Sequence, residues 1–151
     1  MFWGETAINL DGKGRLAIPT RYRPAIGECC EGEMVLTYSP YDSDSLWLYP
    51  MPEWQRVQQD VMSLSSFNPS HRMLQRRLVG AANQVSLDAS GRLLIPHTLR
   101  ERANIDKRAV LMGMGQKFEV WNEQALLAAF DQHLQQGDGT APSPEIEQLR
   151  L

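Results

Sequence analysis

Apolar and polar residues alternate with a period of two along several short stretches of the chain, a pattern typical of half-buried β-strands. In the N-terminal part, Ile8 and Leu10 form one such stretch, and Leu16 and Ile18 form the next. Asp-Gly-Lys-Gly lies between them; Asp favours a tight turn by accepting backbone N–H bonds, and Gly does so by adopting positive φ. The pattern therefore predicts a strand, a tight turn and a second strand.

The same phrase occurs twice, as NLDGKGRLAIP at residues 9–19 and as SLDASGRLLIP at residues 86–96. The aligned pairs are Ile8 with Val85, Leu10 with Leu87, Asp11 with Asp88, Gly14 with Gly91, Arg15 with Arg92, Leu16 with Leu93, Ile18 with Ile95, Pro19 with Pro96 and Arg23 with Arg100. A second hairpin follows in each copy, MVLTY with LWLY and then AVLMG with FEVW. We therefore predict a duplicated unit of about 50 residues, built from two hairpins and a short helix.

Helical spacing of apolar residues is found between and after these hairpins. Pro19 and Pro96 should end their strands, because proline lacks a ladder donor, and should open a helix, because its φ suits the first turn. Short helices are expected at 20–26 and 97–104, longer ones at 53–64 and 123–134, and a further one from 70 to about 79. After Gln136 the chain is rich in Gly, Pro, Ser and acidic residues, and we expect a mobile tail.

One unit of this size cannot bury much surface alone. Two units in one chain can interleave their strands into one closed barrel, which removes exposed strand edges. The predicted fold class is mainly β with flanking helices (α+β), as a duplicated β-barrel. The expected domains are a first module at 1–52, a helical connector at 53–79, a second module at 80–125, and a C-terminal helix with a flexible tail at 126–151.

Positive charge is concentrated in a chain whose net charge is −3. Segments 11–23, 71–77 and 88–108 hold 12 of the 15 Lys and Arg residues but only 4 of the 18 acidic ones. Two of these segments contain the repeated phrase. Because local charge decides where a polyanion docks, the distribution is compatible with nucleic-acid binding, and equally with ordinary solvated arginines.

The sequence contains no recognisable catalytic or metal-binding motif. The three histidines have no metal-ligand spacing, and the adjacent Cys29 and Cys30 match neither a zinc pattern nor a redox pattern. GMGQK at 113–117 lacks the remaining residues of a phosphate-binding loop, so a hairpin turn is the better interpretation. We expect no enzyme activity, no metal and no cofactor.

The chain carries no apolar run of the ~20 residues that a membrane span needs. Its N-terminus, MFWGETAINLDGKGR, lacks the basic start and apolar stretch of a secretory signal. The expectation is a cytoplasmic protein with no membrane partner.

The repeated arginine is the candidate for chemistry. Asp11 and Gly14 are explained by the turn alone, whereas a turn does not require Arg15 or its counterpart Arg92. A guanidinium at this position could bind a guanine edge bidentately or clamp a phosphate. The competing interpretation is a surface ion pair with the neighbouring Asp, worth about 0–1 kcal/mol.

The repeated Asp-x-x-x-Arg turn, apolar strand and Ile-Pro resemble the AbrB/SpoVT-like swapped-hairpin DNA-binding module. Two such modules, an N-terminal Met-Phe-x-Gly, and the stretches DGKGRLAIPTRYR, LYPMPEW, FNPSHRMLQRRLVG and DASGRLLIP make residues 1–130 similar to the MraZ family of bacterial transcriptional regulators. The resemblance implies a double-module barrel in each chain and a closed ring of chains. It also implies binding to repeated promoter elements in double-stranded DNA, with repression of the division and cell-wall gene cluster, including the protein's own operon. A nucleoid-associated location would follow.

Carried over by position, the DNA-facing residues of the first module would be Asp11 as turn former, Lys13 as phosphate anchor and Arg15 as the leading base reader. Asp88 and Arg92 would be their counterparts, and Ser90 replaces the lysine seen at position 13. The charge pattern adds two basic neighbours, Arg21 and Arg23.

Two further questions stay open at this stage. The connector residues Trp54, Met73, Leu74 and Leu78 are either subunit contacts or intrachain core. AbrB-like modules also serve as antitoxins that bind a toxin partner through an extended tail, although the tail here has few apolar residues.

Overall fold

The computed structural model of the chain describes residues 1–136 and 142–151. Its strands are β1 (Phe2–Asn9), β2 (Arg15–Ala17), β3 (Glu33–Tyr38), β4 (Ser45–Pro50), β5 (Asn83–Ser86), β6 (Arg92–Leu94), β7 (Arg108–Gly115) and β8 (Phe118–Asn122). Its helices are η1 (Thr20–Tyr22), α1 (Arg23–Cys30), α2 (Met51–Met62), α3 (Pro69–Leu74), η2 (Gln75–Gly80), α4 (His97–Arg102), α5 (Glu123–Gln136) and α6 (Pro144–Glu147).

The strands of the two halves are interleaved. A six-stranded sheet has the order β1-β7-β8-β4-β3-β5, and a two-stranded ribbon is formed by β2 and β6. All of these pairings are antiparallel, and the first strand of each half pairs with the third strand of the other. The predicted α+β fold with a duplicated, swapped hairpin is thereby confirmed, while closure into a barrel stays a prediction.

The two halves differ in the length of this swapped pairing. β1 runs beside β7 from Asn9↔Arg108 as far as Phe2↔Gly115. β5 pairs with β3 only from Glu33↔Ser86 to Leu36↔Asn83. The residues before β5 form the helix η2, whereas the equivalent residues in the first half belong to β1. β7 is therefore paired with β1 along its whole length, whereas β5 does not reach the far end of β3.

The core contains the apolar positions that alternate along the repeated phrase. Leu16 and Ile18 are fully buried, as are their counterparts Leu93 and Ile95, whereas Ala17 and Leu94 are exposed between them. The period-two pattern therefore identified both the ribbon and its inward face.

The helices follow the sequence predictions with shifted ends. Residues 20–26 form a 3-10 turn that continues into α1, and Glu31 ends α1 in the left-handed region at φ 53°. The stretch 70–79 divides into α3 and the π-helical η2, and the Asn68 side chain caps α3 by accepting the N–H of Ser70. In the tail, residues 137–141 lie outside the described part, and the one-turn helix α6 beyond them was not predicted.

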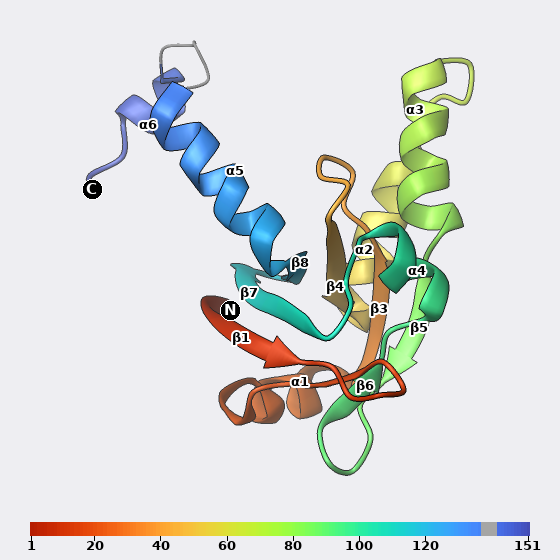
Figure 1. Ribbon diagram of the computed structural model, residues 1–151. Helices are drawn as coiled ribbons and strands as arrows, with labels where there is room; N and C mark the ends of the chain where they lie inside the picture. The colour runs from red at the N-terminus through yellow and green to blue at the C-terminus, as the bar shows by residue number, and fades with distance from the viewer. Residues whose placement is uncertain (137–141) are drawn as a thin grey trace.

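Helices α3 and α5 lie away from the hairpin tips. Figure 1 shows α3 and α5 reaching upward from the sheet, while the β2–β6 ribbon and its loops lie at the lower end. α2 packs on the outer face of the sheet together with η2, in a second apolar cluster that includes Val35, Tyr49 and Val61. Within residues 1–136 and 142–151, no helix combines the length and apolarity needed to cross a lipid bilayer.

This cluster answers most of the question about the connector. Trp54 and Leu78 are buried in it, and Leu74 packs against it half-buried. Met73 is instead 58% exposed. Three of the four candidate contact residues are therefore intrachain core.

Candidate nucleic-acid interface

The first repeated turn is organised by the Asp11 carboxylate. Its Oδ1 accepts the backbone N–H groups of Lys13 (2.9 Å) and Arg15 (3.0 Å), and its Oδ2 accepts the Arg15 Nε–H at 2.7 Å. The backbone bond from Arg15 is the main reason that the pKa of Asp11 falls to about 2. Desolvation opposes this shift, and the bonds from the Arg15 side chain and the Lys13 backbone lower the pKa further. One carboxylate thus shapes the turn and orients the guanidinium.

The second turn repeats this geometry more loosely. Asp88 Oδ1 accepts the N–H groups of Ser90 (2.8 Å) and Arg92 (3.0 Å), which lowers the pKa of Asp88. The ion pair between Arg92 Nε and Asp88 Oδ2 is longer, at 3.4 Å. Arg92 therefore follows the predicted pattern but is held less tightly than Arg15.

The two turns lie together as one surface. Arg92 Nη1 is 3.9 Å from Asp11 Oδ2, so the arginine of one module reaches the carboxylate of the other. The charge of Arg15 also contributes to the lowered pKa of Asp88. The interleaved fold therefore brings Asp11, Arg15, Asp88 and Arg92 to one site.

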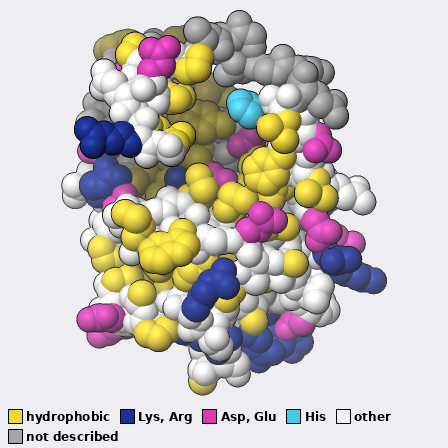
Figure 2. All heavy atoms as spheres, turned by 90° about the vertical axis from the view of Figure 1, so that its left-hand side faces the viewer, with side chains coloured by type: hydrophobic (Ala, Val, Ile, Leu, Met, Phe, Trp, Pro, Cys, Tyr) yellow, Lys and Arg dark blue, Asp and Glu magenta, His cyan; other side chains and the backbone are white. Residues whose placement is uncertain are grey.

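The ribbon explains how the arginines come to face outward. In the β2–β6 register Arg15 lies opposite Leu94 and Ala17 lies opposite Arg92, so each arginine has an exposed apolar neighbour across the ribbon. The side chains of Arg15 and Arg92 are 31% and 37% exposed. Lys13 is exposed at the first tip, and Figure 2 shows Lys and Arg side chains gathered at this lower end of the molecule.

A second pair of arginines supports the turns from behind. Arg23 Nε donates to the carbonyl of Ile18 at 2.8 Å, and its counterpart Arg100 Nε donates to the carbonyl of Ile95 at 3.0 Å. A Cβ added to Gly91 would overlap the Arg23 side chain, and one added to Gly14 would overlap Arg100. Each arginine thus packs on the turn of the other module.

Arg100 was absent from the residues chosen by sequence reasoning. Its alignment with Arg23 was visible, but the charge pattern favoured a DNA contact over an internal one. The informative signal was the pair of repeated glycines, which mark positions where another group approaches the backbone closely.

Arg21 is also held within the protein. Its Nη2 donates to Thr6 Oγ1 at 2.7 Å and to the Tyr22 hydroxyl at 2.9 Å, and its guanidinium lies 4.6 Å from the centre of the Tyr22 ring. The structure therefore brings Arg15, Arg92 and the two aspartates together and gives Arg21 and Arg23 internal contacts. A DNA role for all seven residues stays a prediction.

Asp11→Asn is expected to lower the free energy of unfolding at neutral pH and to flatten its fall in acid. Because the folded-state pKa of Asp11 lies below its ordinary value of 3.8, its stabilisation is present above that value and is lost as the pH falls toward about 2. Urea unfolding at a series of pH values between these limits measures the effect. Asp131→Asn on α5 is the control; an acid dependence unchanged in Asp11→Asn would contradict this role.

The side chains at the ribbon indicate which class of ligand it can bind. In the part of the chain that the structure describes, no group of three or more His, Cys, Asp or Glu side chains is placed to hold a metal ion. The site offers guanidinium groups, an ammonium group, backbone N–H groups and small apolar side chains, which suit recognition of a polyanion.

An interleaved pair of hairpin modules with paired Asp–Arg tips defines the class of small duplicated swapped-hairpin proteins. The chain belongs to the MraZ family: a family model described as "MraZ protein, putative antitoxin-like" matches residues 1–77 and again residues 78–141. The two matches correspond to the two halves whose strands interleave.

Curated relatives match most or all of the chain. The chain is 49% identical over 151 residues to the transcriptional regulator MraZ of Xanthomonas campestris pv. campestris (strain 8004), covering 100% of both chains. It is 46% identical over 153 residues to the transcriptional regulator MraZ of Thioalkalivibrio sulfidiphilus, again covering 100% of both. The protein of that name from Stenotrophomonas maltophilia is 48% identical over 138 residues, 91% of this chain and 93% of the relative.

Proposed function

We propose that this protein is a transcriptional regulator that binds double-stranded DNA through the paired hairpin tips and acts as a repressor. Its targets are repeated promoter elements of the division and cell-wall gene cluster, including its own operon. The observation that carries the proposal is the meeting of two Asp–Arg turns at one end of the molecule, with Arg92 Nη1 3.9 Å from Asp11 Oδ2. The protein acts without catalysis, in the cytoplasm at the nucleoid.

The contact with Asp11 fixes the orientation of the Arg15 guanidinium group. Asp11 engages only the Nε of Arg15 within the described residues, and both Nη groups are left to form a bidentate fork toward a guanine edge or a phosphate. The inner face of the β2–β6 ribbon is buried, with Leu16 and Leu93 in the core, and this burial holds both strands in place. Lys13 adds a phosphate contact beside the fork, and Leu94 and Ala17 offer apolar contact to a thymine methyl.

A single pair of tips makes few contacts, so specific binding calls for several copies. The duplication indicates where copies meet. Trp54 of α2 and Leu126 of α5 occupy equivalent helix positions beside Tyr49 and Trp121, but only the first cluster is covered by η2. α5 instead carries exposed apolar side chains at helical spacing: Leu127, Phe130 and Leu134.

We assign this α5 surface to a second copy of the chain. In the first half, Leu78 and Val79 of η2 pack against the equivalent apolar cluster around Trp54. By analogy, an apolar helical surface of a second copy would fit on α5. The exposed Met62, Phe67 and Met73 of the connector offer such a surface to a neighbour. Contact between two different surfaces is head-to-tail, and such contacts give a closed ring when the rotation closes. Figure 2 shows apolar side chains over the face that carries α5.

Phe130→Asp is expected to convert the oligomer into smaller species while keeping the fold. The reason is that a carboxylate would be buried without a partner at the apolar contact. Light scattering coupled to size-exclusion chromatography measures the mass, and circular dichroism checks the fold. Ala128→Asp, an exposed position on the same helix, is the control and should keep the wild-type mass. Equal masses for both variants and wild type would exclude α5 from the contact.

Gel shift with the DNA immediately upstream of the protein's own gene tests the proposed function. A fragment with several repeats should bind more tightly than one with a single repeat. The logarithm of the affinity should fall by about 0.9 per log unit of salt for each phosphate contacted. Absence of binding, or an affinity that does not change with salt concentration, would contradict the proposed function.

The alternative is an AbrB-like antitoxin that binds a toxin partner. The family description includes antitoxin-like proteins, and Ile146 and Leu149 are exposed in the tail at 54% and 57%. Pull-down with the full chain separates the two: a stoichiometric small protein partner favours the antitoxin, and specific recovery of the upstream DNA favours the regulator.

A further inference from the structure

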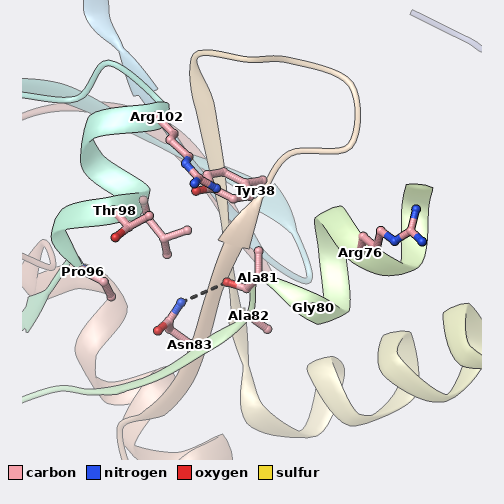
Figure 3. Close-up of a pocket in the computed structure, with 10 residues that line it drawn as sticks. Tyr38, Arg76, Gly80, Ala81, Ala82, Asn83, Pro96, Thr98 and Arg102 are labelled. Carbon is pink, nitrogen blue, oxygen red and sulfur yellow. Dashed lines mark hydrogen bonds between the residues drawn. The ribbon is translucent and has the colours of Figure 1, made fainter. Parts of the chain in front are cut away.

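A pocket of about 600 Å³ lies away from the hairpin tips, between α4, the start of β5, the end of η2 and β3. Figure 3 shows Arg102 and Tyr38 at the top of it, Thr98 at the left and Asn83 below, with Arg76 apart from them at the right. The residues come from both halves of the chain, so the pocket is a product of the interleaved fold.

The pocket exists because the duplication is imperfect. Asn83, the first residue of β5, pairs with Leu36, so the strand begins two residues short of the level of Tyr38. In the other half, β1 continues past this level, and its Gly4 pairs with Gly113. The space beside Gly113 is filled by the backbone of Phe2 and Trp3, whereas the space beside Tyr38 is open.

A side chain also fills the equivalent space in the first half. Arg21 occupies the repeat position of Thr98, and its guanidinium bonds Thr6 Oγ1, the repeat position of Asn83. Thr98 is much shorter than Arg21 and leaves that volume empty. The second half therefore retains the site but lacks the group that fills it.

The open pocket is positively charged and has an unused donor. Among the described residues that line it none is acidic, and neither Arg76 nor Arg102 forms an ion pair with a carboxylate in the described chain. Tyr38 is 6% exposed, and its hydroxyl has no hydrogen-bond partner among the described residues. A buried polar group without a partner is costly, and a ligand oxygen would satisfy it.

We propose that this pocket binds a small anionic molecule that carries a phosphate ester or carboxylate group. The acidic group sits between the Arg102 guanidinium and the Thr98 hydroxyl, because guanidinium forks pair with planar oxyanions and phosphates. The Tyr38 hydroxyl is buried in this structure, and the group reaches it when an exposed side chain such as that of Arg102 moves. The Asn83 side chain, which donates to the carbonyl of Ala81 at 2.9 Å, and Arg76 contact the rest of the molecule. A DNA backbone is a poor occupant, since the Tyr38 hydroxyl lies below the surface.

The pocket is linked to the hairpin tips by one short helix. α4 contributes Thr98 and Arg102 to the pocket, and its Arg100 packs on Gly14 of the first turn. A ligand that holds α4 in place holds Arg100 against this turn. Occupancy of the pocket therefore increases the protection of the Gly14 amide from hydrogen exchange. This effect concerns the protein alone and does not depend on DNA binding.

Calorimetric titration of the full chain at constant ionic strength tests the site, with inorganic phosphate and succinate as probes and chloride as the background anion. One or both probes should bind saturably, and the better probe identifies the acidic group. Arg102→Gln should weaken binding by about tenfold or more, since a charge-assisted bond is lost. Tyr38→Phe, which keeps the packing, should weaken it by a smaller factor, and Arg150→Gln, a control in the tail, should not.

Three results would overturn the inference. The first is that neither probe binds saturably. The second is that Arg102→Gln binds the probe as well as wild type, which would place the anion at the hairpin tips. The third is that Arg150→Gln loses as much affinity as Arg102→Gln, which would indicate a general charge effect. Hydrogen exchange read by mass spectrometry, with the bound probe, tests the link through α4. Unchanged protection around Gly14 would remove that link.

Discussion

Arg15→Ala is expected to lower the affinity for the upstream DNA by about 100-fold or more while leaving the fold and the oligomer intact. One bidentate contact to a base is worth about 1–3 kcal/mol, and its loss is repeated at every tip that an oligomer places on the DNA. The effect on folding should be small, because the Arg15–Asp11 pair is about one third exposed and such pairs contribute about 0–1 kcal/mol. Gel shift or fluorescence anisotropy at physiological salt measures the affinity.

The matched control for Arg15 is Arg56→Ala. Arg56 is an exposed arginine on α2 that pairs with Glu53 and Asp60, so its removal changes net charge equally but far from the ribbon. Retained affinity in Arg15→Ala, or an equal loss in Arg56→Ala, would contradict direct recognition by the tip. Arg92→Ala measures the share of the second module in the same assay.

Gly14→Ala is expected to reduce the free energy of unfolding by about 2–4 kcal/mol, one of the largest effects of any single methyl group in this chain. Two independent costs add. Gly14 has φ +85°, which strains any residue with a Cβ, and the new methyl would displace the Arg100 side chain that packs on the turn. Arg100 would then lose its bond to the carbonyl of Ile95. Urea unfolding followed by tryptophan fluorescence measures the change.

The same turn supplies the control. Gly12 has no atom within 4 Å of an added Cβ and no positive φ, so Gly12→Ala should change stability by less than about 0.5 kcal/mol. Gly91→Ala should behave like Gly14→Ala, since Gly91 has φ +74° and the Arg23 side chain stands against it. Equal stabilities of Gly12→Ala and Gly14→Ala would contradict the packing of Arg100 on the turn.

The strands were predictable because each carries its own signal. Leu16 and Ile18 alternate with Arg15 and Ala17, and burial on one side of a two-stranded ribbon needs only that alternation. In the second copy Leu94 lies between Leu93 and Ile95, so there the repeat of the phrase indicates the inward positions. The repeat made interleaving the natural solution, because neither half could bury its apolar face alone. The tips were predictable for the same reason, since Asp and Gly encode their turns locally.

Other features depend on contacts between distant residues and leave little trace in a single sequence. Arg23 and Arg100 look like surface charges until the fold brings each against a glycine of the other module. Trp54 and Leu78 belong to one intrachain cluster only because η2 folds back on α2. The pocket at Tyr38 arises because β5 begins late, at Asn83, which an alignment of the two repeats does not reveal.

Photocrosslinking from the tips tests the central claim most directly. A benzophenone side chain placed at Lys13 or at Ser90, both exposed, would report whether each tip touches DNA. One placed at Tyr41, 83% exposed in the loop between β3 and β4, would serve as the control. The account predicts crosslinks to the upstream DNA from positions 13 and 90 and none from position 41. Crosslinks from position 41 alone, with no crosslink from either tip to bound DNA, would contradict it.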